Sequence, residues 1–193
     1  MTHGSPTDLL VLHAVRLKGF AGTDALAARF DLDGHQTREE LLDAEASGWV
    51  TRSAFADLAG WTLTGAGRAR NETQLREEVD RVGARRTVLA VHDEFLPLNT
   101  RASAILTAWQ LGSGNGVRRL FRELGDLADG LRPLEESLTG HLSRFAGYHA
   151  RFTRALARAV DDPAWITGIT VDSCHRVWFE FHEDLVATLN LTR

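Results

Sequence analysis

The chain has 193 residues and a formal net charge of −4 at neutral pH, with 44% hydrophobic and 25% charged residues. This composition is typical of a soluble globular protein, and the length allows one large or two small domains. We expect no membrane span, because no apolar run approaches roughly 18 residues, and no signal peptide, because the N-terminus lacks the basic and apolar regions of one. The single cysteine, Cys174, excludes an internal disulfide and multi-cysteine zinc sites, which suits a cytoplasmic protein.

Three helices are predicted at the start of the chain. Apolar residues 9–17 predict a first helix, and residues 24–30 predict a short second one. A third helix is expected over residues 35–47 and should end at Gly48, a residue that favours the left-handed conformation after a helix. Its inward side is expected to carry Leu41, Leu42 and Ala46.

A β-hairpin should follow the third helix. Residues 49–55 alternate apolar and polar side chains, as a half-buried strand does, and residues 61–63 form the returning strand. The tip of the hairpin is expected at residues 56–60. Thr64 should cap the next helix, and the glycines of Gly65-Ala66-Gly67 allow a close approach at its start.

This order of elements is that of a winged helix. The segments Leu41-Leu42, Gly48-Trp49-Val50 and Trp61-Thr62-Leu63-Thr64-Gly65-Ala66-Gly67 resemble the MarR/PadR-type winged-helix transcriptional regulators. In those proteins a leucine-rich recognition helix leads into a wing and then into an aromatic-x-Leu-Thr-x-x-Gly junction. The resemblance covers roughly residues 7 to 80. It implies a homodimer that binds double-stranded DNA.

The resemblance makes the third helix the recognition helix, which would enter the major groove of DNA. Four residues at its start are expected to contact base edges and phosphates: His35, Gln36, Thr37 and Arg38. Arg52 on the wing would contact the DNA backbone or the minor groove. Glutamine pairs with adenine and arginine with guanine, so the side-chain chemistry fits. The alternative interpretation is a solvated helix start with no ligand.

The charge of this region opposes DNA binding. Residues 1–70 contain seven basic and nine acidic residues, a net charge of −2. Glu39 and Glu40 directly follow Arg38, and carboxylates near phosphates are repelled. Whether this region binds DNA therefore depends on the local electrostatic field at the surface that would face the groove.

We place the domain boundary at residue 83. Residues 1–83 form the winged-helix DNA-binding domain, and residues 84–193 form a helical bundle for dimerisation and effector binding. Pro97 is expected to end or kink a helix, and Pro133 to interrupt a later one. This domain is similar to the helical C-terminal halves of actinobacterial regulators.

Polar groups are concentrated in two apolar parts of the second domain. His175, Trp178 and His182 share one helix face at i, i+3 and i+7. The other candidates for an effector site are His92, Glu94, Arg101 and Trp109. Three interpretations remain open: hydrogen-bonded histidines in an aromatic core, a small-molecule effector pocket, or a metal site of histidines and carboxylates. Helical histidines seven residues apart lie roughly 10 Å apart, too far to chelate one ion without a third element.

No catalytic motif is present in the sequence. It lacks the Gly-x-Ser-x-Gly and His-Glu-x-x-His patterns, and glycine-rich residues 112–116 lack the lysine that follows in a phosphate-binding loop. We therefore expect neither an enzyme nor a cofactor or metal. The favoured hypothesis is a dimeric transcriptional regulator. The alternatives are a winged-helix adaptor that binds protein instead of DNA, and a helical-bundle metal protein.

Overall fold

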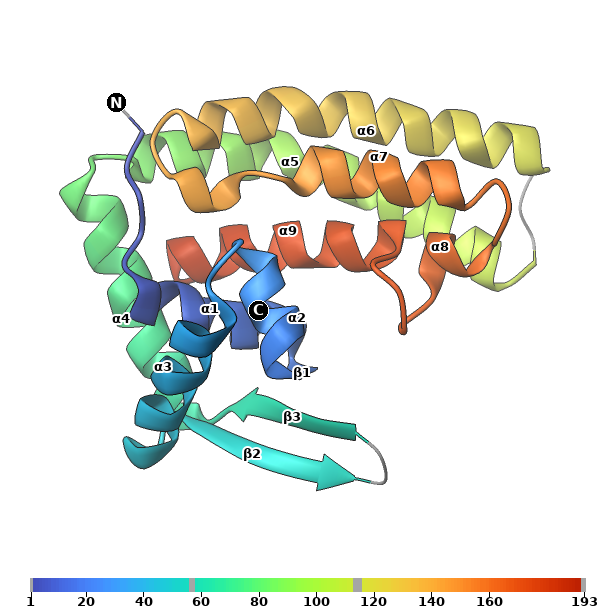
Figure 1. Cartoon of the computed structure of the whole chain (residues 1–193). Helices are drawn as coiled ribbons and strands as arrows, with labels where there is room; N and C mark the ends of the chain where they lie inside the picture. Colours follow the sequence, from blue (N-terminus) through green and yellow to red (C-terminus); the bar gives the residue numbers. More distant parts are fainter. Residues whose placement is uncertain (1, 56–57, 113–115, 192–193) are drawn as a thin grey trace. The chain divides into compact units, whose positions relative to one another are not determined.

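The computed structural model describes residues 2–55, 58–112 and 116–191. The chain divides into two compact units (Figure 1). The winged-helix unit comprises His3–Gly83 and the end of the chain from Ala187 onward, and the helical unit lies mainly in Ala84–Val186. The described residues are mostly helical, with one small antiparallel sheet, which confirms the predicted fold class.

The winged-helix unit follows the predicted order of elements. Its elements are α1 Thr7–Lys18, β1 Phe20–Ala21, α2 Thr23–Arg29, α3 Gly34–Ala46, β2 Val50–Phe55, β3 Leu58–Leu63 and α4 Gly65–Arg81. In the sheet, β3 lies between β1 and β2 and pairs antiparallel with both. Strand β1 was not predicted, because two residues are too few to show an alternating pattern. The returning strand β3 begins at Leu58, three residues earlier than predicted, and residues 56–57 of the predicted tip lie outside the described part of the chain.

The core of the winged-helix unit forms between the first three helices and the sheet. Leu12 of α1, Leu26 of α2 and Leu41 of α3 are buried together with Val50 and Trp61 from the strands. A second, smaller cluster is formed by Leu9, Leu75 and Ala187. The end of the chain thus belongs to this unit, which the sequence did not indicate.

The junction between the wing and α4 is held by Thr64. Its side chain accepts a hydrogen bond from the N–H of Gly67 (2.9 Å) and donates one to the carbonyl of Gly48 (2.8 Å). A Cβ atom on Gly67 would overlap the carbonyl oxygen of Trp49, whereas one on Gly65 would meet open space. The predicted cap is confirmed, and the close approach occurs at Gly67.

The helical unit contains longer helices than the sequence predicted. Its elements are α5 Arg85–Gln110, α6 Val117–Thr139, the 3-10 helix η1 Ser143–Phe145, α7 Tyr148–Arg158, α8 Ala164–Thr167 and most of α9 Cys174–Leu189. In the described residues, no helix is both long and apolar enough to cross a membrane.

Neither proline ends its helix, since α5 continues through Pro97 and α6 continues through Pro133. Pro97 is exposed, so water can satisfy the carbonyl that loses its helical partner. On the other side of α5, Phe95 and Ala102 are fully buried and hold the helix on both sides of the proline. Burial of one continuous face thus outweighs the single lost hydrogen bond.

We predict that Gly67→Ala destabilises the winged-helix unit by roughly 2 kcal/mol or more, because the added methyl group meets backbone that cannot rotate away. The control is Gly65→Ala, two residues earlier in the same turn, which should be neutral or slightly stabilising. Urea unfolding of both variants measures the difference. Equal stabilities would show that the strand-to-helix junction is not tightly packed.

Candidate nucleic-acid interface and cavity

Helix α3 is capped at its start by Asp33, the residue that directly precedes it. The Asp33 carboxylate accepts a hydrogen bond from the N–H of Gln36 (2.8 Å), as residues at this position of a helix often do. The Thr37 hydroxyl donates to the carbonyl of Asp33 (2.8 Å). Together these bonds fix where α3 starts and how its first turn is rotated.

The inward side of α3 differs from the predicted one. Thr37 and Leu41 are 0% exposed and Ala44 is also buried, so these residues face the core. Thr37 was expected to contact DNA, and its burial corrects that expectation. Leu42 (37% exposed) and Ala46 were expected to face inward but are exposed. The reason is that the Thr37 hydroxyl is satisfied by the Asp33 carbonyl and can therefore be buried.

The other predicted contact residues on α3 are accessible. His35, Gln36 and Arg38 are all exposed. Within the described residues, none of their side chains forms a hydrogen bond or an ion pair. Their polar groups are therefore available to a ligand.

The wing is tied to the end of α3. The backbone N–H of Arg52 donates to the Glu45 carboxylate (3.3 Å), and the Arg52 guanidinium lies 5.8 Å from the centre of the Trp61 ring. Arg52 itself is exposed on β2. Helix α3 and the wing thus form one surface of the winged-helix unit.

This surface is more acidic than a typical DNA-binding surface. Glu39, Asp43 and Glu45 of α3 are exposed, against Arg38 of α3 and Arg52 of the wing. Partial burial raises the pKa of Glu40, and the charges of Asp8 and Asp43 raise it further. The acidic balance noted in the sequence is therefore present on the surface itself.

The predicted effector residues do not form one site. The Trp178 side chain is buried, its indole N–H donates to the Asn99 side chain (3.0 Å), and its ring centre lies 5.1 Å from that of Phe95. The His182 ring lies 5.5 Å from the same phenylalanine, and His175 is half-buried nearby on α9. This arrangement is that of a hydrogen-bonded aromatic core.

The remaining predicted effector residues lie along α5. His92 is half-buried with its Nδ1 3.6 Å from the Asp93 carboxylate. Glu94 is exposed, and Arg101 forms an exposed ion pair with Asp126 of α6 at 3.6 Å. Glu94 and Arg101 therefore lie at the surface, whereas His92 is half-buried.

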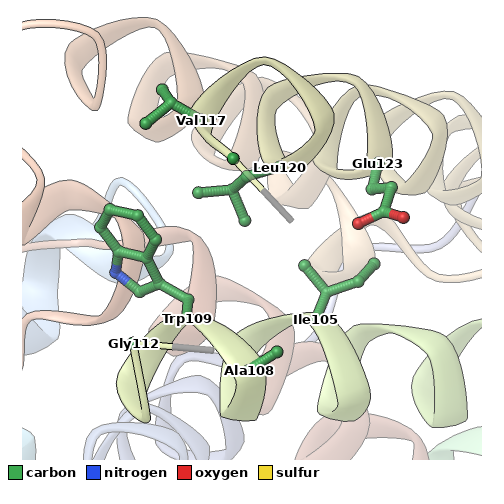
Figure 2. A pocket seen from close by; sticks show the side chains of 8 residues that line it. Ile105, Ala108, Trp109, Gly112, Val117, Leu120 and Glu123 are labelled. Atoms are coloured by element: carbon green, nitrogen blue, oxygen red, sulfur yellow. The ribbon is translucent and has the colours of Figure 1, made fainter. Parts of the chain in front are cut away.

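A cavity of about 310 Å³ lies between the end of α5 and the start of α6. It is lined by Ile105, Ala108, Trp109, Gly112, Gly116, Val117, Leu120 and Glu123. Figure 2 shows the side chains of Ile105 and Trp109 rising from α5 toward those of α6. Trp109 is the one predicted effector residue that lines this cavity. The sequence did not indicate the others, because apolar residues at helical spacing give the same sequence pattern whether they line a cavity or fill a core.

Sequence analysis also missed a buried ionic cluster in the helical unit. The buried Arg144 side chain is paired with Asp184, which also accepts a hydrogen bond from the Tyr148 hydroxyl (2.8 Å). Arg151 contacts the carboxylates of Asp172 and Glu180, each at 2.6 Å. All of these charged groups except Asp172 are largely buried, and each has a close partner, as buried charges require. We interpret the cluster as a structural link from η1 and α7 to Asp172 and α9.

The charge of Arg151 is stabilised by this cluster. Burial by itself would lower the pKa of Arg151, but its hydrogen bond to Asp172 and the charges of Glu180 and Asp172 outweigh burial and raise it. The guanidinium therefore remains a cation, and the two carboxylates around it remain paired.

Cys174 is fully buried at the start of α9. Burial raises the pKa of its thiol to about 12, so the thiol is protonated at neutral pH and poorly reactive. In the part of the chain that the structure describes, no group of three or more histidine, cysteine, aspartate or glutamate residues could hold a metal ion.

The chain matches no protein-family model, no curated protein and no solved structure. The winged-helix assignment therefore rests on the order of the elements and the pairing of the strands.

Proposed function

We propose that the chain is a DNA-binding transcriptional regulator that acts as a homodimer and inserts α3 into the major groove. One observation carries this proposal. The start of α3 is capped and anchored, and it presents Gln36 and Arg38 to solvent with no partner among the described residues. The backbone that carries these side chains is already ordered, so binding has to immobilise only the side chains themselves.

The chemistry of the exposed side chains supports contact with base edges. The Gln36 amide can donate to and accept from adenine, and the Arg38 guanidinium can pair with guanine or with phosphate. His35 lies in the first turn of α3, where it can reach a phosphate. Arg52 on the wing supplies a second cation for the DNA backbone.

The acidic residues of α3 limit this binding to a small number of phosphate contacts. Non-specific affinity for DNA comes mainly from cations that neutralise phosphates. Helix α3 and the wing offer Arg38 and Arg52 against the carboxylates of Glu39, Asp43 and Glu45. We therefore expect weak binding by one protomer and a dimer that reads two half-sites.

We predict that Arg38→Ala and Gln36→Ala each weaken binding to a duplex selected from a random pool by about 1–3 kcal/mol. Arg38→Ala should also reduce the slope of log affinity against log salt by about one, because it removes a cation, whereas Gln36→Ala should leave the slope unchanged. Fluorescence anisotropy across a salt series measures both quantities. The control is Arg132→Ala, an exposed arginine on α6.

If the wild-type chain enriches no duplex from the pool, the regulator proposal is rejected. If it does enrich one and both α3 variants bind like the Arg132→Ala control, the recognition-helix assignment is rejected.

A second candidate is a protein-interaction adaptor that uses the same surface. The exposed carboxylates of Glu39, Asp43 and Glu45 favour it, since they complement a basic protein better than a phosphate backbone. Such an adaptor would retain no duplex even at low salt, which the same titration detects.

We further propose that the α5–α6 cavity binds the effector of the regulator. Its walls are mostly apolar, Trp109 provides an aromatic surface, and Glu123 provides one polar group. A volume of about 310 Å³ suits a small aromatic molecule with one hydroxyl group. Such a ligand alters DNA binding only if it prefers one arrangement of the dimer.

We predict that Ala108→Phe, which fills the cavity, weakens the binding of 2-naphthalenemethanol at least about tenfold, as expected when a buried aromatic ring is excluded. Ligand-observed NMR titration measures this affinity. The control is Ala157→Phe, which adds the same ring at an exposed position of α7. Equal binding by the two variants would show that the compound does not occupy the cavity.

A further inference from the structure

We infer that Glu39 of α3 determines base preference by selecting cytosine, an inference that rests on the proposed DNA-binding function. Because Glu39 directly follows Arg38 in the sequence, its carboxylate would oppose DNA binding if it lay near the phosphates. Its place on α3 gives it a different role.

The rotation of α3 places Glu39 at the centre of the outward face. A helix turns about 100° per residue, so the side opposite buried Thr37, Leu41 and Ala44 carries His35, Glu39 and Ala46. All three of these residues are exposed.

The neighbours of Glu39 lie to either side of this line. Gln36 and Asp43 lie on one flank, and Arg38 lies on the other. When a helix lies in the groove, the line that faces away from the protein core is nearest the base edges, and the residues beside that line can reach base edges or phosphates. Glu39 is therefore directed toward the bases and away from the backbone that would repel it.

A carboxylate at this position can only accept hydrogen bonds. In the major groove the donors on base edges are the N4 amino group of cytosine and the N6 amino group of adenine. Adenine carries the N7 acceptor beside its amino group, and a carboxylate is repelled by that acceptor. Cytosine presents its amino group without a neighbouring acceptor on the same base, so Glu39 should prefer it.

The Glu39 carboxylate is available for this contact. The structure gives it no hydrogen bond and no ion pair within the described residues. The negative charge of Glu39 also increases specificity, because it weakens binding to every duplex that does not offer a hydrogen-bond donor at the right position.

The test is a selection of duplexes from a random pool by the wild-type chain, by Glu39→Gln and by Asp43→Asn. Glu39→Gln keeps the size of the side chain and adds a donor, so it should pair with adenine. We expect the preferred base at one position to change from cytosine in the wild-type selection to adenine in the Glu39→Gln selection. Each protein should favour its own base over the other roughly tenfold. Affinity for unrelated duplexes should rise, because a negative charge is removed.

Asp43→Asn is the matched control, since it removes the same charge from an exposed position one turn further along α3. It should raise non-specific affinity but leave the preference at the Glu39 position unchanged. Circular dichroism confirms that all three proteins are folded.

The outcomes separate the two claims. If the wild-type chain selects a motif and Glu39→Gln selects the same base at every position, the inference is wrong and the proposed function stands. A change of base that Asp43→Asn reproduces would also overturn the inference, because charge alone would then explain it. If the wild-type chain selects no motif, the proposed function itself fails.

Discussion

The candidate site depends on the burial of one side of α3. Thr37, Leu41 and Ala44 are held in the core of the winged-helix unit, and Asp33 caps the first turn. Because the helical repeat is fixed, these contacts determine which side chains face outward. A rotation of α3 by a third of a turn would bury polar groups of Gln36 or Arg38 without partners, at a considerable cost in free energy. The packing of the inward side of α3 therefore determines which of its residues face solvent.

The acidic character of α3 changes how recognition would work. A surface rich in lysine and arginine binds any duplex through phosphates, and base contacts then refine the choice. Here Arg38 and Arg52 stand against several carboxylates, so base edges must contribute a larger share of the affinity. In the proposed regulator, low non-specific binding and reliance on a dimer would follow from the same balance. In the helical unit, the ionic cluster around Arg144 and Arg151 links η1 and α7 to Asp172 and α9.

The structural features that were predicted correctly are those set by local sequence signals. Gly48 and Thr64 mark the ends of neighbouring elements, and the alternation after Gly48 indicates a strand, so the order of elements in the winged helix was correct. The rotation of α3 was predicted incorrectly, because the burial of a threonine depends on its hydroxyl finding the Asp33 carbonyl. The cavity beside Trp109 depends on how α5 packs against α6, and the continuity of α5 through Pro97 depends on its packing against α9. A single sequence carries no local signal for either kind of packing.

The most direct test of the central claim is the change in backbone amide chemical shifts when the chain binds its selected duplex. If α3 and the wing contact DNA, the largest shifts should lie in α3, from His35 to Ala46, and in the wing, from Val50 to Phe55. Shifts concentrated on another surface, with α3 unaffected, would contradict it.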